Sequence, residues 1–326
     1  MRSWSHNTLD ERQIIRSIVE AAGRVSRGYS RIGDDVAVIP ARDRKVVLKV
    51  DMLVESTDVP PGMDYRQAAR KVVAMCVSDF AAKGVRPDSF MVSLGLKRGI
   101  TQNQVDLLGS GFRDAEEEWE VRMVGGDTNE ADQLVVDCAM VGFAGKVVER
   151  SGAKPGDALV VTGPFGYPPA GLRIMIKGAR ANKKFRKAAK KSVTMPTPNL
   201  EVGVALADYL TSAMDSSDGL ARSIHTLAEE SNVGFTLDMM PAAEGATQFA
   251  EENGLSLHDL VMEGGEEYVI VGTVNPKKLA AARSAARSVG GELLTIGKAT
   301  REKGRIFLRT GNSMRMIEDR GWTHLR

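Results

Sequence analysis

The sequence predicts a two-domain α/β protein, and three observations support this. Strand patterns and helix patterns alternate in both halves of the chain, without a short internal repeat. A length of 326 residues, 43% of them hydrophobic, suits two domains of ordinary size. A turn-forming run from Arg150 to Asp157 separates the halves. We therefore expect an N-terminal domain over residues 1–148 and a C-terminal domain over residues 149–326.

The composition argues against several classes of protein. The net charge of +2, from 44 basic and 42 acidic side chains, gives no global field of the kind that nucleic-acid binders carry. No apolar stretch approaches the roughly 18 residues that span a bilayer, and residues 1–10 lack the hydrophobic region of a signal peptide. Cys76 and Cys138 lie in apolar runs and are expected to be buried, reduced thiols. We expect a cytoplasmic protein without a nucleic-acid or membrane partner.

Runs of β-branched and other apolar residues, bounded by turn residues, predict the strands. The run at residues 121–124 is expected to stop at Gly125, and the run at residues 292–297 to be the last strand. The full set is expected at residues 36–39, 46–51, 90–96, 121–124, 134–145, 158–162, 235–237, 269–273 and 292–297.

Capping residues predict where the helices begin. Asp64 can cap a helix that continues to about residue 82, and Thr101 with Gln104 forms a capping box for a helix reaching about residue 119. The serines and aspartates of residues 215–218 can cap another. The full set of helices is expected after Asn7 or Thr8 and at residues 64–82, 101–119, 170–177, 202–210, 220–230 and 276–288.

A basic stretch from Lys177 to Lys191 contains eight Lys or Arg residues and no acidic residue. A solvated helix face is the simpler interpretation of such a run. Contact with a phosphorylated ligand or an acidic partner is the alternative.

Aspartates recur beside glycine, beside serine or at the ends of predicted strands. They are Asp34, Asp35, Asp51, Asp79, Asp127, Asp215 and Asp218. Each alone has an ordinary explanation as a turn residue or a helix cap. If several converge, their mutual repulsion requires either protonation or a cation. Mg²⁺ prefers such hard oxygen ligands together with substrate phosphates, so the pattern indicates a magnesium and phosphate site.

Other catalytic patterns are weak. The glycines of residues 125–126 and 163–166 can bring backbone amides close to a phosphate, but neither a P-loop nor a dinucleotide fingerprint is present. His6, His225, His258 and His324 show no metal-ligand spacing, so we expect surface roles for them. No serine or cysteine has the surroundings of a nucleophile. The sequence does not favour covalent catalysis.

A series of motifs runs in order from about residue 30 to the C-terminus. The motifs are Gly33-Asp34-Asp35, Val50 to Glu55, Ser78 to Gly84, Gly125 to Thr128, Arg150 to Asp157, Val161 to Gly163, Ser217 to Leu220 and Gly264 to Glu266. This series resembles that of the thiamine-monophosphate kinase family, which belongs to the aminoimidazole ribonucleotide synthetase-like superfamily. The ordered series is more specific than any one motif.

The resemblance implies a homodimer whose N-terminal sheets join into a shared barrel, with ATP and several Mg²⁺ ions beside the C-terminal domain. It implies metal ligands at Asp35, Asp51, Asp79, Asp127, Asp215 and Asp218, and at Val50 through its carbonyl oxygen. It also implies nucleotide contacts at Gly126, Asp127, Arg150 and Ser217, and thiamine phosphate contacts at Asp58, Glu266 and Trp322. The implied reaction transfers the γ-phosphoryl group of ATP to thiamine monophosphate.

The chain also departs from the pattern of this family. Lys49-Val50 stands where the family usually has Ser-Thr, which removes a hydroxyl ligand, and Glu267 replaces an aspartate. Two other functions remain open. One is a ligase resembling aminoimidazole ribonucleotide synthetase, which acts on formylglycinamidine ribonucleotide. The other is a nucleotide-binding module without turnover, which the change at Lys49 favours.

Overall fold

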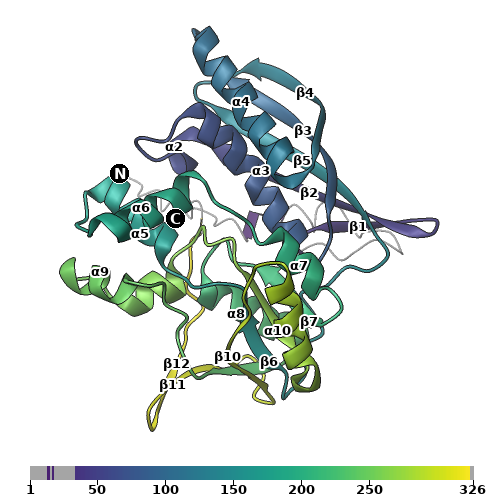
Figure 1. Ribbon diagram of the computed structural model, residues 1–326, viewed down its shortest axis with the longest axis vertical. Helices are drawn as coiled ribbons and strands as arrows, with labels where there is room; N and C mark the ends of the chain where they lie inside the picture. The colour runs from purple at the N-terminus through teal and green to yellow at the C-terminus, as the bar shows by residue number, and fades with distance from the viewer. Residues whose placement is uncertain (1–12, 15–16, 18–33, 324–326) are drawn as a thin grey trace, which may run out of the picture.

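The computed structural model describes residues 13–14, 17 and 34–323 and divides the strands between two sheets (Figure 1). Residues 13, 14 and 17 are helical, but most of the helix predicted after Asn7 or Thr8 lies outside the described residues, as does Gly33. Each sheet is built from one half of the chain. The two-domain α/β prediction is therefore confirmed.

The N-terminal sheet has five strands in the order β1-β2-β5-β3-β4. Neighbouring strands are antiparallel except β3 and β4, which are parallel. The strands are β1 (Ala37–Ala41), β2 (Arg44–Val54), β3 (Pro87–Leu96), β4 (Arg122–Glu130) and β5 (Val135–Ala144). A short helix, α2 (Glu55–Asp58), follows β2 directly.

The N-terminal domain contributes two long helices, α3 (Tyr65–Ala82) and α4 (Gln102–Trp119), which pack against each other. As predicted, Asp64 caps α3 in a capping box with Gln67, and Thr101 caps α4 in a box with Gln104. Most residues of α3 are buried, because it contacts β2 and β5 of one domain and β7 and β9 of the other. In Figure 1, α3 runs between the N-terminal sheet and the C-terminal half.

The C-terminal sheet has seven strands in the order β12-β11-β8-β10-β6-β9-β7. They are β6 (Ala158–Val161), β7 (Leu210–Asp215), β8 (Gly234–Leu237), β9 (Ile270–Val274), β10 (Leu294–Thr300), β11 (Ile306–Thr310) and β12 (Ser313–Met316). Its helices are α5 (Tyr167–Lys177), α6 (Lys183–Thr194), α7 (Leu200–Leu206), α8 (Leu220–Ser231), α9 (Ala246–Glu252) and α10 (Leu279–Ser288). A π-helix, η1 (Asp259–Glu263), and a 3₁₀-helix, η2 (Pro276–Lys278), complete the set.

Four predictions about the elements were wrong. β4 does not stop at Gly125 but continues to Glu130, because β3 pairs with it throughout. The helix predicted to reach residue 210 ends at Leu206, and β7 follows it. The strand at residues 294–300 is not the last, since β11 and β12 form a further hairpin. Residues 215–218 do not cap α8, whose N-cap is Gly219 without a side-chain hydrogen bond.

The two domains share one apolar core. It contains Val72 and Phe80 of α3 together with residues of the C-terminal half, such as Leu206 and Ile270. The connection at residues 145–157 joins the two sheets, and the boundary at residue 148 remains our division of the chain. Cys76 and Cys138 are both buried and free, as predicted. Among the described residues, the helices are too short or too polar to cross a membrane.

One face of the N-terminal sheet is open and apolar. Side chains alternate along β2, so Val47 and Leu53 are fully buried while Val50 and Met52 are more than half exposed. The open face comprises Val50, Met52, Met91, Val124 and Phe143. Lys49 and Asp51 point to the opposite, inner face.

Candidate active site

Three buried carboxylates meet where the two domains join. Asp35 precedes β1, Asp79 lies in the last turns of α3, and Asp215 ends β7. Each residue is at most 5% exposed. One oxygen from each lies within 4.8 Å of the others, as metal coordination would require. The structure thus brings together three of the predicted metal ligands from distant parts of the chain.

Burial and mutual repulsion raise the pKa of two of these carboxylates. Burial raises the pKa of Asp215 to about 7, and the charge of Asp35 adds to this, although Lys49 and the Ser78 hydroxyl oppose it. The Ser78 Oγ donates a hydrogen bond to Asp215 Oδ2 at 3.0 Å. Burial likewise raises the pKa of Asp79 well above its usual value, against the opposing charge of Lys49, and the charges of Asp215, Asp51 and Asp35 raise it further. A bound cation would remove this cause of protonation.

Asp35 behaves in the opposite way. Burial is the largest influence on its pKa and raises it, but the charges of Lys83 and Arg150 together outweigh burial and lower the pKa below its usual value. The fully buried Lys83 Nζ lies 2.7 Å from Asp35 Oδ2 and 2.6 Å from Asp34 Oδ1. It also donates to the Ala213 carbonyl at 2.8 Å. Asp35 is therefore held as a carboxylate by the chain itself.

Arg150 binds the same carboxylate from the connection between the domains. Its Nε donates to Asp35 Oδ1 at 2.6 Å, and its Nη2 contacts the same oxygen. The Arg150 backbone amide donates to Asp34 Oδ2 at 3.3 Å. Asp34 thus supports the basic groups rather than joining the three-carboxylate cluster.

Lys49 lies between two further members of the predicted set. Its Nζ is 2.9 Å from Asp79 Oδ2 and 3.2 Å from Asp51 Oδ1. Asp51 Oδ2 is shielded from solvent, and no hydrogen-bond donor among the described residues reaches it. Hard carboxylate oxygens, a shielded oxygen without a donor and two aspartates with a raised pKa fit Mg²⁺. The ligands available for it here are Asp35, Asp51, Asp79 and Asp215.

The predicted substrate residues converge around Lys71, whose side chain is 1% exposed. Its Nζ lies 2.5 Å from Glu266 Oε1 and 3.0 Å from the Asp58 carbonyl oxygen. Glu266 has a left-handed backbone with φ of 63°. A Cβ placed on its neighbour Gly265 would lie 3.6 Å from Trp322 Cβ. Asp58, Glu266 and the exposed Trp322 therefore belong to one region.

The predicted nucleotide residues are more scattered. Ser217 is exposed, and its carbonyl oxygen accepts a hydrogen bond from the Glu266 amide at 2.6 Å. The Asp218 carbonyl oxygen accepts from the Trp322 amide at 3.0 Å, so both residues adjoin the substrate region. A Cβ on Gly126 would lie 2.4 Å from the Val92 carbonyl oxygen. Close packing of β4 on β3 is therefore sufficient reason for glycine at this position.

A single chain does not bring Asp127 to the carboxylate cluster. The pairing of neighbouring strands shows which face of the sheet Asp127 lies on. Asp127 on β4 is opposite Ser93 on β3, and Ser93 is opposite Asp137 on β5. Asp137 is in turn opposite Met52 on β2, whose side chain faces outward. Asp127 therefore faces the open side of the sheet. At about 4.8 Å per strand it lies roughly 14 Å from Asp51 across three strand spacings. The Val50 side chain also lies on the open side of the sheet. The role of the Val50 carbonyl oxygen as a metal ligand stays a prediction.

Sequence reasoning missed the roles of three lysines, Lys49, Lys71 and Lys83. A signal was present for two of them. Lys71 interrupts the apolar sequence of α3, most of whose residues are buried, and Lys83 ends this helix. A lysine in such surroundings requires an acidic partner. The signal for Lys49 was its alternation with Val47 on the inner face of β2.

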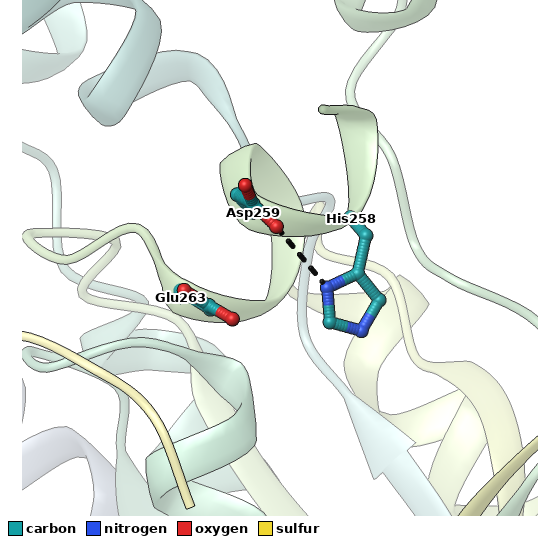
Figure 2. A group of neighbouring side chains, drawn as sticks. All are labelled: His258, Asp259 and Glu263. Carbon is teal, nitrogen blue, oxygen red and sulfur yellow. Dashed lines mark ion pairs between the residues drawn. The ribbon is translucent and has the colours of Figure 1, made fainter. Parts of the chain in front are cut away.

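A second group of possible metal ligands lies on η1, at some distance in sequence from the predicted set. Figure 2 shows His258 and Asp259 joined by an ion pair, with Glu263 one turn away. The Nδ1–Oδ1 distance is 3.5 Å, and the three ligand atoms lie within 4.8 Å of one another. The side chain of His258 is only 13% exposed, so the predicted surface role was wrong for this histidine. Asp259 is exposed, and we assign this group no part in the site.

The other sequence expectations have simpler outcomes. His225 is half-buried and contacts the Ile317 carbonyl oxygen at 3.0 Å, while His6 and His324 lie outside the described residues. The basic stretch forms the end of α5 and most of α6, where all the lysines and arginines from residue 183 to residue 191 are exposed. The Gly166 amide donates to the buried Glu267 carboxylate at 2.5 Å, so a carboxylate of the chain already uses this amide.

Comparison with known proteins gives a consistent result. Family models described as AIR synthase related protein, N-terminal domain and C-terminal domain, match residues 33–144 and 154–309. The chain is 37% identical to a thiamine-monophosphate kinase of Nitrosopumilus maritimus, over 98% of this chain and 99% of that protein. It is 30% identical to one of Pyrococcus horikoshii, over 97% and 96%. A solved structure of AaThiL from Aquifex aeolicus, complexed with AMPPCP and TMP, is also similar. Its TM-score is 0.83 at 23% identity, and the match covers 99% of both chains. This similarity supports the fold alone.

Proposed function

Because the chain belongs to the thiamine-monophosphate kinase family, whose members are phosphotransferases, we propose that it transfers the γ-phosphoryl group of ATP to thiamine monophosphate. The products would be thiamine diphosphate and ADP. The observation that carries the proposal is the buried cluster of Asp35, Asp79 and Asp215, which suits a divalent cation. It occurs in a chain that aligns with these kinases over nearly its whole length.

The proposed chemistry needs no general base. The acceptor is a phosphate oxygen that already carries negative charge, so catalysis reduces to alignment and charge neutralisation. When bound, Mg²⁺ neutralises phosphate charge and fixes the phosphate oxygens. Asp35, Asp51, Asp79 and Asp215 would hold it, with Asp218 and the Val50 carbonyl oxygen as further ligands. We propose several such ions and an in-line transfer.

ATP and thiamine monophosphate would bind to different residues of the molecule. Arg150 would add a fixed positive charge near the nucleotide, which Ser217 and Gly126 would also contact. On the acceptor side, Trp322 would stack on the cationic ring of thiamine, with Asp58 and Glu266 nearby. AaThiL, a protein of the same fold, has been crystallised with both AMPPCP and TMP, which supports a site for two phosphorylated ligands.

We propose that the active form is a homodimer in which two N-terminal sheets form a shared barrel. The open face of the sheet supports this, because Val50, Met52 and Met91 are each more than half exposed and form an apolar patch with Val124 and Phe143. Asp127 lies on the same side, so a dimer is the arrangement that would enclose it. Met52→Glu should convert the dimer to monomers in sedimentation velocity, and a wild-type monomer at micromolar concentration would contradict the proposal.

The deciding experiment mixes the purified protein with ATP, Mg²⁺ and thiamine monophosphate. Thiamine diphosphate and ADP should form in equal amounts, and EDTA should stop the reaction. Asp79→Asn is the matched control, since it removes one carboxylate without changing the size of the side chain. ATP binding without thiamine diphosphate would instead support a nucleotide-binding module. Turnover of formylglycinamidine ribonucleotide alone would support the ligase. We place the reaction in the cytoplasm, where ATP is available and both free cysteines stay reduced.

A further inference from the structure

Lys49 occupies an inward position of β2 within the carboxylate cluster. It lies on the same face as Val47 and Leu53, which are fully buried, and its own side chain is 19% exposed. Its ammonium nitrogen is within 3.2 Å of Asp51 and 2.9 Å of Asp79. Ion pairs with two carboxylates favour the charged form of this lysine.

The acidic groups of the region outnumber the basic groups. Five aspartates, Asp34, Asp35, Asp51, Asp79 and Asp215, face three basic groups, Lys49, Lys83 and Arg150. Lys83 and Arg150 form ion pairs with Asp34 and Asp35. Within the described residues, Lys49 is the cation that pairs with Asp51 and Asp79. It is therefore in the position where a bound cation would otherwise bridge the carboxylates of β2 and α3.

An ordinary surface ion pair does not account for this arrangement. Exposed pairs contribute little to stability and need no particular surroundings. Here both carboxylates point inward, and Asp79 is almost fully buried. Lys45 provides the comparison, since it lies on the same strand and the same face, four residues away from Lys49, but forms no ion pair with a carboxylate of the described residues.

We propose that the Lys49 ammonium group is a built-in cation of the active site and occupies one cation position between Asp51 and Asp79. The chain then binds one divalent ion fewer than its carboxylates would hold without this lysine. The position shared by Asp35, Asp79 and Asp215 stays available to a divalent ion. This inference rests on the proposed metal-dependent function.

The test is a count of Mn²⁺ ions bound per chain, by calorimetric titration and by the electron paramagnetic resonance signal of free Mn²⁺, with AMPPCP present. Lys49→Met keeps the length of the side chain and removes its charge, so it should bind one more Mn²⁺ than wild type. Lys45→Met is the matched control and should keep the wild-type count. Lys49→Arg keeps the charge and should do the same. Equal counts for wild type and Lys49→Met would overturn the inference.

A folding defect would also be informative. If Lys49→Met unfolds in EDTA, either Mn²⁺ or the second change Asp51→Asn should restore the fold, because each removes the charge imbalance. Failure of both to do so would overturn the inference. The metal-dependent function is judged separately by the wild type. If wild type binds Mn²⁺ and Lys49→Met binds the same number, only the role of Lys49 is lost, whereas no uptake by either protein would contradict both.

Discussion

Lys71→Met tests whether one buried lysine joins the two domains at the substrate region. Lys71 belongs to α3 of the N-terminal domain, and its Nζ lies 2.5 Å from Glu266 Oε1 in the C-terminal domain. Methionine keeps most of the length and packing of the side chain but lacks the ammonium group. The substitution therefore leaves the Glu266 carboxylate without this partner in a largely buried place.

The size of the effect follows from the burial of the two groups. Removing one partner of a buried ion pair costs about 3–5 kcal/mol. Lys71 is 1% exposed but the Glu266 side chain is 21% exposed, so water can partly compensate and the lower limit of the range applies. Unfolding entropy is about 2.1 cal/mol/K per residue, which gives about 0.7 kcal/mol/K for this chain. A loss of about 3 kcal/mol therefore lowers Tm by about 4 °C.

The assay is thermal unfolding followed by circular dichroism, with Lys71→Met/Glu266→Gln as the matched control. The double variant removes both charges and should recover at least half of the lost stability. Lys71→Met should also raise KM for thiamine monophosphate more than KM for ATP, because Glu266 is in the proposed acceptor region. A Tm within 1 °C of wild type, or a double variant no more stable than the single one, would refute the reasoning.

Three further predictions concern the metal, the substrate and the sheet. In EDTA, Tm should fall as pH rises from 5 to 8. The pKa of Asp215 is about 7 in the folded state against 3.8 in the unfolded state, and the pKa of Asp79 is also raised in the folded state. The folded state therefore binds more protons than the unfolded state and loses stability as these protons leave. For Asp215 alone the loss between pH 5 and pH 8 is at most about 2.7 kcal/mol, because about two of these pH units lie below its folded-state pKa of about 7. Mg²⁺ should reverse the fall at pH 8, and a Tm independent of pH in EDTA would contradict this prediction. Trp322→Ala should raise KM for thiamine monophosphate about tenfold with KM for ATP unchanged, as loss of a cation–π contact of up to about 2 kcal/mol implies, and an unchanged KM would remove Trp322 from the site. Asp127→Asn should reduce kcat by at least a hundredfold with an unchanged circular dichroism spectrum, and near-normal kcat would exclude it as a ligand.

The sequence predicted elements best where capping and turn chemistry is local. Asp64 and Thr101 marked the starts of α3 and α4 because a capping box needs only four consecutive residues. β4 extends past its glycines because of its parallel partner β3, which no local pattern reveals. The β11–β12 hairpin was predictable, since Gly311-Asn312 between two apolar runs is a turn signal that we did not use.

For the site, the types of residue were easier to predict than their partners. The aspartates beside glycines and strand ends indicated a cation site, and Asp35, Asp79 and Asp215 do meet. The lysines that neutralise them come from other elements, and pairing between distant elements depends on how the domains pack. Asp127 illustrates the remaining limit. It lies on the open face of the sheet, away from the cluster, and its proposed place in the site rests on the proposed dimer, so neither the sequence nor one chain can assign it by geometry.

The helix α3 explains how acceptor and metal regions can be held at a fixed separation. Lys71, beside the proposed substrate residues, and Asp79, in the carboxylate cluster, are eight residues apart on this helix, which corresponds to about 12 Å. The helix is buried by both domains, so neither end can shift without disturbing the shared core. Phosphoryl transfer without a general base depends on alignment. A continuous helix buried along its length supplies that alignment more rigidly than loops would, which is why the stability and KM effects of Lys71→Met should appear together.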